Sequence, residues 1–147
     1  MPVHTYRYGE ATELPGLRVG VTRHLPRGVK KTDYARRGYF DVWLPTVAPS
    51  GDLLRSFLDG KVTFARFASR YRRELRRPEA KHTVELLAAV AQRQPVNLGC
   101  FCEDPARCHR TLLAQVLAEA GAPLAPEVRA PAPGFASPAC SMPEIED

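Results

Sequence analysis

The sequence VNLGCFCEDP occupies residues 96–105 and joins a mostly apolar run to a strong helix-start signal. The run at 96–102 is short and bounded, which predicts a central strand of a sheet. Asp104 and Pro105 follow it, and an aspartate N-cap with proline at the first helical position is typical of a helix beginning. The predicted helix runs to Ala120 and ends at Gly121. This strand–turn–helix unit predicts an α/β fold.

More strands and helices are predicted on the N-terminal side of this unit. Three further strands are expected, at 4–8, 17–22 and 39–44. Ser50 and Thr63 are N-cap residues for two helices, and a third helix begins near Pro78. The second helix carries an apolar stripe at helical spacing, made of Phe64, Phe67, Ala68, Tyr71 and Leu75. Strands alternating with helices predict a small three-layer, Rossmann-like α/β sandwich with a mostly parallel sheet.

Length and composition limit the class of protein. The chain has 147 residues, of which 44% are hydrophobic and 25% charged, as in ordinary single globular domains. No apolar run approaches the roughly 20 residues that cross a bilayer, so no membrane partner is expected. The first residues lack a basic region followed by an apolar stretch, so no secretory signal is expected. We therefore expect a cytoplasmic protein whose four cysteines are thiols or metal ligands rather than disulfides.

Charge and proline are unevenly distributed along the chain. Residues 1–94 hold 18 Lys/Arg against 9 Asp/Glu, although the net charge of the whole chain is only +5. Residues 123–147 hold six of the 14 prolines and are net acidic. Such a stretch buries too little apolar surface to offset its ordering entropy. We expect a single α/β domain at 1–122 and a Pro/Ala-rich flexible tail at 123–147, in which Cys140 has no role.

The main candidate site lies where the strand at 96–102 meets the following helix. Cys100 and Cys102 are two residues apart, so their side chains leave the same face of the strand, at its carboxyl end. The helix that follows buries a stripe of Leu112, Leu113, Val116, Leu117 and Ala120. His109 falls on this stripe one turn after the expected helix start and should face the sheet, flanked by Cys108 and Arg110. Free N–H groups at the start of the helix favour an anion.

Several chemistries fit this arrangement. The first is a pocket for a small anion, formed by Arg107, Arg110 and the helix N-terminus. The second is a reactive thiolate among Cys102, Cys108 and His109. The third is a metal site, although the ligand spacing is unusual for zinc and the adjacent Cys108 and His109 would diverge on a helix. The alternative without function is that the cysteines are small core residues. A phosphatase-type Cys-x5-Arg loop is excluded, because no cysteine has that spacing to an arginine.

Two basic stretches complete the candidate surface. Arg23 and Arg27 follow the strand at 17–22, and parallel strands would bring this loop to the same sheet edge as His109. We expect Arg23 or Arg27 to lie within about 8–10 Å of His109, a range comparable to the Debye length at 0.1 M salt. Asp41 is expected to pair with an arginine of this loop rather than to act in the site. The helix after Thr63 presents a basic face of Arg66, Arg70, Arg73 and Arg77, which suits a nucleic-acid backbone.

Several of these stretches resemble a known family. Arg23-x-x-Pro26-Arg27-Gly28-x-Lys30-Lys31, together with Trp43-Leu44, Ala48-Pro49-Ser50 and Phe67-x3-Tyr71-x2-Glu74-Leu75, resembles the YeaO-like branch of the domain-of-unknown-function 488 (DUF488) family. The segment from Cys100 to Arg110 resembles the Cys-His-Arg motif of the wider family. The YeaO-like pattern has Trp at position 25 and Asn-His-Ala at 108–110, so this chain resembles a mixture of the two. The resemblance implies a small α/β fold and no particular reaction.

The sequence thus predicts a protein that binds a small phosphorylated or nucleotide-like anion at the helix N-terminus, with room for thiol-dependent chemistry. The expected catalytic residues are Cys102, Cys108 and His109, and the expected ligand-binding residues are Arg23, Arg27, Cys100, Arg107 and Arg110. Two alternatives stay open, a nucleic-acid-binding accessory protein and a Cys/His metal-binding protein. Whether the protein is an enzyme, and which cofactor it uses, is left open by the sequence.

Overall fold

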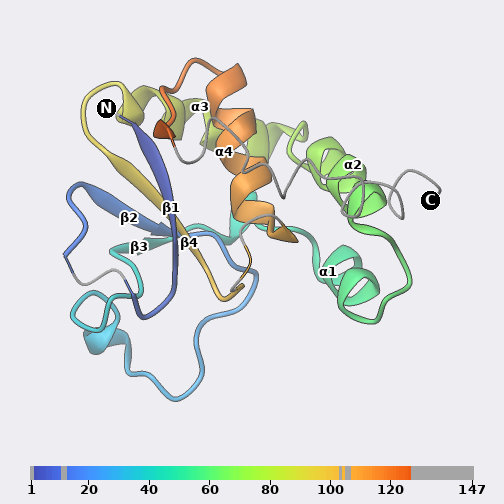
Figure 1. Cartoon of the computed structure of the whole chain (residues 1–147), viewed down its shortest axis with the longest axis horizontal. Coiled ribbons are helices and arrows are strands. Elements are labelled where there is room, and N and C mark those ends of the chain that lie inside the picture. The colour runs from blue at the N-terminus through green and yellow to red at the C-terminus, as the bar shows by residue number, and fades with distance from the viewer. Residues whose placement is uncertain (1, 11–12, 103, 105–106, 127–147) are drawn as a thin grey trace.

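The computed structural model describes residues 2–10, 13–102, 104 and 107–126. Four strands form one parallel sheet in the order β1-β4-β2-β3 (Figure 1), with bounds Val3–Arg7 (β1), Leu17–Gly20 (β2), Val42–Trp43 (β3) and Val96–Cys100 (β4). Four α-helices cover it, with bounds Gly51–Leu58 (α1), Phe64–Glu74 (α2), Pro78–Ala91 (α3) and His109–Glu119 (α4). Two short 3-10 helices span Lys31–Asp33 (η1) and Pro45–Val47 (η2). The predicted α/β sandwich with a parallel sheet is confirmed.

Strand β4 holds the centre of the sheet. All five of its residues are buried, and it pairs with β1 from Val3↔Val96 onward and with β2 from Leu17↔Val96 onward. A strand buried on both faces reads as a nearly continuous apolar run, as this sequence does. Because all pairs are parallel, the carboxyl ends of the strands share one edge.

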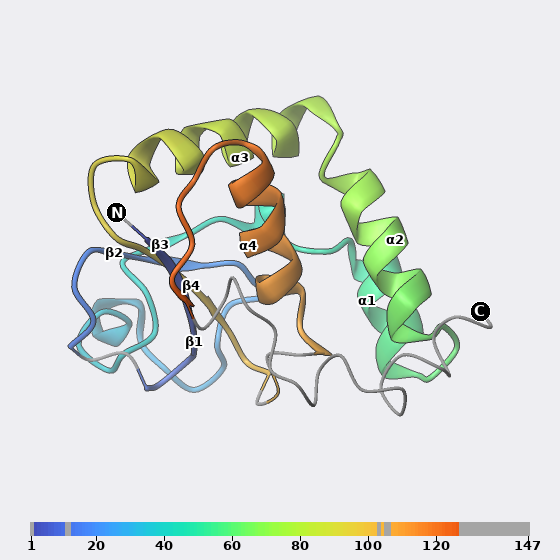
Figure 2. The ribbon, with the colours of Figure 1, turned by 45° about the horizontal axis from the view of Figure 1, so that its top comes forward.

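Helices α3 and α4 pack on one face of the sheet, and α1 and α2 lie beside them at one end of the molecule, with their apolar sides in the same core (Figure 2). The predicted α2 stripe is confirmed, since Phe64, Phe67, Tyr71 and Leu75 are all buried and Ala68 packs against the same cluster. Ser50 and Thr63 cap α1 and α2 through side chains that accept hydrogen bonds from Leu53 N and Arg66 N. None of the described helices is long and apolar enough to cross a membrane.

The other face carries an aromatic layer that the sequence reasoning did not foresee. Tyr6, Tyr8, Tyr34 and Phe40 form a second buried cluster, separate from the helix side. Two strand glycines make room for it, because a Cβ atom on Gly99 would lie 2.3 Å from Tyr6 Cζ and one on Gly20 would lie 2.5 Å from Tyr8 Oη. The third layer of the sandwich is therefore a loop packed through aromatic rings.

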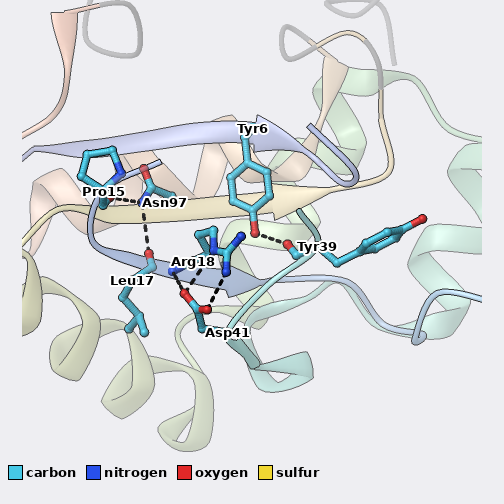
Figure 3. Close-up of polar contacts among 7 residues, drawn as sticks. All are labelled: Tyr6, Pro15, Leu17, Arg18, Tyr39, Asp41 and Asn97. Atoms are coloured by element: carbon cyan, nitrogen blue, oxygen red, sulfur yellow. Dashed lines mark hydrogen bonds and ion pairs between the residues drawn. The ribbon is translucent and has the colours of Figure 1, made fainter. Parts of the chain in front are cut away.

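This aromatic layer also explains why β3 is short. The strand predicted at 39–44 contains only Val42 and Trp43 in strand conformation, because Tyr39 and Phe40 leave the sheet to pack in the aromatic cluster. Figure 3 shows the polar contacts beside it: Asp41 accepts hydrogen bonds from the Arg18 backbone N–H and from its guanidinium, at 2.8–3.2 Å. These bonds hold the pKa of Asp41 below its usual value. Asp41 is thus a pairing residue, but its partner is Arg18 of β2 and not an arginine of the following loop.

Helix α4 begins later than predicted. Its first residue is His109 and its N-cap is Cys108, so the expected start at 104–105 is wrong for the α-helix; Asp104 instead accepts a turn hydrogen bond from Arg107 N. The helix ends at Glu119, close to the prediction, followed by Gly121 with a φ of 105°. Ala120, predicted to be buried, is exposed because the helix ends before it, and Ala114, which was not predicted, is buried.

The expected tail lies mostly outside the described residues. Its described beginning packs on the domain: Val3 N donates to Pro123 O, Ala125 N donates to Val3 O, and Leu124 and Ala125 are buried. The domain thus includes residues 123–125, while Cys140 lies outside the described residues.

Gly99→Ala should destabilise the fold, because the added methyl group overlaps the Tyr6 ring. We expect the free energy of unfolding, measured by urea denaturation, to fall by about 1–3 kcal/mol. Gly51→Ala is the matched control, since nothing lies within 4 Å of its Cβ position. Equal effects of the two substitutions would contradict the close packing of Tyr6 on β4.

Candidate functional site

Three thiols meet at the carboxyl edge of the sheet. Cys100 is the last residue of β4, Cys102 follows two residues later, and Cys108 is the N-cap of α4. The three sulfur atoms lie within 4.8 Å of one another, and the Cys100 and Cys102 sulfurs are 3.6 Å apart. The two sulfurs come together as expected, but the strand predicted at 96–102 ends at Cys100, so Cys102 lies just beyond β4 rather than on it. The extended backbone of Cys108 (φ −128°, ψ 143°) directs the chain into the helix beside them.

His109 completes this thiol cluster from the first turn of α4. Its Nε2 lies 2.6 Å from the carbonyl oxygen of Val21. A carbonyl only accepts, so Nε2 carries the proton and Nδ1 presents its lone pair. Nδ1 lies 3.9 Å from the Cys100 sulfur and 4.0 Å from the Cys108 sulfur. Burial lowers the pKa of His109, which favours the neutral imidazole.

Cys108 and His109 do not diverge as predicted. The prediction placed both residues within the helix, whereas α4 starts at His109 and Cys108 precedes it in extended conformation. The two side chains therefore converge, with sulfur and Nδ1 4.0 Å apart.

Arg110 is a buried cation beside the thiols. Its side chain is 3% exposed, and Nη1 donates a 2.7 Å hydrogen bond to the carbonyl oxygen of Cys102. Its Nε atom is buried and has no hydrogen-bond partner among the described residues. A buried guanidinium is costly without a compensating negative charge. This requirement points to negative charge on the neighbouring sulfurs.

The thiols differ in acidity. Hydrogen bonds donated by Cys100 and Cys108 lower the pKa of Cys102 far below that of an ordinary thiol, with smaller contributions from His109 and Arg110. The hydrogen bond to Cys102 raises the pKa of Cys100, and burial raises that of Cys108. Among the three thiols, these shifts favour the thiolate on Cys102, which is also the one that is not fully buried.

The arginines that were expected to join this site are engaged elsewhere. Arg23 donates from Nε and Nη2 to the carbonyl oxygens of Pro49 and Ala48, both at 3.0 Å. The Arg107 guanidinium lies over the rings of Phe57 and Phe64, 5.9 and 5.4 Å from their centres. Arg27 is exposed. Of the predicted site residues, the structure brings together Cys100, Cys102, Cys108, His109 and Arg110.

Two members of the site's surroundings were missed by the sequence reasoning. The Val21 carbonyl orients His109, and the Tyr71 ring meets the imidazole edge-on at 5.7 Å. Tyr71 donates its hydroxyl proton to the Val47 carbonyl oxygen at 2.5 Å, which fixes the ring behind His109. Tyr71 was expected only as part of the α2 stripe, and a backbone carbonyl leaves no signal in a sequence.

The chain is similar in sequence to several known proteins. The family model described as "Active DUF488-N3 subclade" (DUF488-N3a) matches residues 3–121. "Uncharacterized protein YeaO" of Escherichia coli is 35% identical over 112 residues, which cover 75% of this chain and 90% of that protein. "Uncharacterized protein Rv3073c" of Mycobacterium tuberculosis is 35% identical over 102 residues, covering 69% of this chain and 80% of that protein. The search of solved structures gave no match.

Cys102 should be alkylated by iodoacetamide with little dependence on pH in the metal-free protein. Its lowered pKa keeps it a thiolate, whereas the thiolate fraction of an ordinary thiol falls about tenfold per pH unit below about 8.5. We expect its rate, followed by peptide mass spectrometry, to change less than about threefold between pH 6 and 8. Cys140 is the internal reference.

Cys108→Ala tests the cause of this reactivity. The substitution removes one hydrogen-bond donor to the Cys102 thiolate, so the pKa of Cys102 should rise and its alkylation rate should depend more on pH. A Cys102 rate that follows the pH dependence of Cys140 in the unmodified chain would refute the assignment of the thiolate.

Proposed function

The chain belongs to the DUF488 family, in its YeaO-like branch, and we propose that it binds a thiophilic divalent metal ion such as Zn²⁺ through Cys100, Cys102, Cys108 and His109. The observation that carries this proposal is the convergence of three sulfur atoms and one imidazole lone pair at the carboxyl edge of the sheet.

The distances within the cluster support a tetrahedral site. With Zn–S bonds of about 2.3 Å and Zn–N bonds of about 2.0 Å, two sulfurs at the corners of a tetrahedron are about 3.8 Å apart, and a nitrogen and a sulfur about 3.5 Å apart. The separations here are 3.6 Å between the sulfurs of Cys100 and Cys102, and 3.9 and 4.0 Å from His109 Nδ1 to the sulfurs of Cys100 and Cys108. A slight contraction of the cluster would therefore let these donor atoms share a small ion.

The surroundings of His109 support the same proposal. Histidine ligands typically donate their other ring N–H to a carboxylate or a backbone carbonyl, which fixes the tautomer and orients the ring. His109 does so through Val21 O. Burial also favours its neutral form, which is the form that binds a metal.

Arg110 supplies the remaining charge. Three thiolates and a divalent ion carry a net charge of −1, which balances one buried guanidinium. The Nε atom without a hydrogen-bond partner then has sulfur-borne negative charge nearby. A site without Arg110 would leave that negative charge uncompensated in a buried environment.

The competing functions have weaker support. A pocket for a small anion was expected to use Arg23 and Arg107, but their guanidinium groups contact backbone carbonyls and aromatic rings. A reactive thiolate at Cys102 requires the metal-free state. If the cluster holds a metal, the same low pKa makes Cys102 a ready ligand.

Titration of the apo protein with Co²⁺ tests the proposal. We expect one equivalent of Co²⁺ to bind per chain, with a sulfur-to-cobalt charge-transfer band and visible bands as intense as those of tetrahedral Co²⁺. Adding Zn²⁺ should displace the Co²⁺ and remove these bands. Cys108→Ser should abolish the charge-transfer band or weaken it strongly. Cys140→Ser is the control and should leave it unchanged. Absence of the band in the unmodified chain would overturn the proposal.

His109→Ala separates a four-ligand site from a three-thiolate site with an open position. Loss of the imidazole ligand should weaken Zn²⁺ binding, measured by competition with a chromophoric chelator, by at least about tenfold. Tyr71→Phe is the control, because it keeps the ring that packs against His109 and removes only the hydroxyl bonded to Val47 O. An unchanged affinity in His109→Ala would mean that three thiolates alone hold the ion.

A further inference from the structure

The three thiols of the cluster differ in their access to solvent. Cys102 is partly exposed, whereas Cys100 is 3% and Cys108 is 1% exposed. A small oxidant in solution therefore reaches Cys102 first. The Cys100 sulfur lies 3.6 Å from that of Cys102, compared with about 2.05 Å in a disulfide bond, and the three described cysteines are all free thiols. One accessible thiol thus lies beside a buried partner with which it can form a disulfide.

The buried charge of Arg110 links the oxidation state of these thiols to metal binding. Three thiolates and a divalent ion carry a net charge of −1, which the guanidinium balances. A disulfide removes two of the thiolates, so the ion and the remaining thiolate would carry a net charge of +1 beside the same buried cation. Like charges repel strongly where water is excluded. The ion also loses two of its four ligands, so both effects favour its release.

We infer that a peroxide closes a disulfide between Cys102 and Cys100 and that this bond expels the metal ion. The inference rests on the proposed function, because it concerns the regulation of the same site. The reaction takes place when Cys102 is detached from the ion, and its partial exposure makes it the ligand that solvent displaces. Cys100 is the partner because its sulfur is held close by, so its attack is intramolecular and faster than that of a thiol from solution.

Hydrogen peroxide supplies the oxidising equivalents for this reaction. The Cys102 thiolate attacks a peroxide oxygen, the O–O bond breaks and hydroxide leaves, which converts the sulfur to a sulfenic acid. The Cys100 thiolate then attacks this sulfur, so that the S–S bond forms, the S–O bond breaks and a second hydroxide leaves. Two thiolates thereby lose a pair of electrons to one peroxide molecule. Only Phe101 lies between the two cysteines, and a disulfide across so short a loop is strained and readily reduced by thiols.

The test adds hydrogen peroxide to the full chain loaded with Zn²⁺. Zn²⁺ has no redox chemistry of its own, so its release reports on the thiols. Released Zn²⁺ is measured with a chromophoric chelator that is too weak to remove it from the reduced protein, and the total bound Zn²⁺ is measured after denaturation. Peptide mass spectrometry locates the disulfide. A chain that binds no Zn²⁺ before peroxide is added would overturn the proposed function and this inference with it.

We expect about one Zn²⁺ to leave for each Cys100–Cys102 disulfide formed, and dithiothreitol to restore binding. Cys140→Ser is the control and should release Zn²⁺ as the unmodified chain does. In the metal-free protein, Cys102→Ser should slow disulfide formation among the remaining cluster thiols at least about tenfold, because both are buried. Zn²⁺ that binds and is retained after peroxide treatment, or equal rates of disulfide formation in Cys102→Ser and the unmodified chain, would overturn the inference alone.

Discussion

The hydrogen bond from His109 Nε2 to the carbonyl oxygen of Val21 holds the first residue of α4 against the end of β2. It satisfies a buried imidazole that would otherwise lose its hydrogen bonds to water. It also fixes where the helix begins, and therefore the extended backbone of Cys108 and the place of its sulfur beside Cys100. Tyr71 closes the far side of the ring. The thiol cluster depends on this single contact between two elements 88 residues apart.

Much of this arrangement follows from periodicities that a sequence displays. The two-residue spacing of Cys100 and Cys102 placed both sulfurs on one face, and the apolar stripe of α4 turned His109 toward the sheet. The buried side of α2 followed from its helical spacing. Parallel pairing brought the chain after β2 to the same edge, where Val21 meets His109. These features depend on local geometry that every strand and helix shares.

Other features depend on contacts between distant segments. The Asp104-Pro105 signal was local, whereas the helix start was set by the distance at which His109 reaches Val21. Arg23 appeared as a free charge in the sequence, but the carbonyl oxygens of Ala48 and Pro49 accept its hydrogen bonds. The aromatic layer requires Gly20 and Gly99 to lie directly beneath tyrosine rings, which neither glycine reveals by its neighbours in the chain.

The edge position of β1 has a consequence for the order in which the molecule is built. Among the described strands β1 pairs only with β4, and Val3 lies opposite Val96. During synthesis β1 therefore stays unpaired while about 90 further residues leave the ribosome, because the sheet cannot form before β4 has emerged. Cys100 is the last residue of β4, and Cys102 and Cys108 follow it within eight residues of the sequence. The closing of the sheet and the gathering of the thiols are thus late and nearly simultaneous steps of folding.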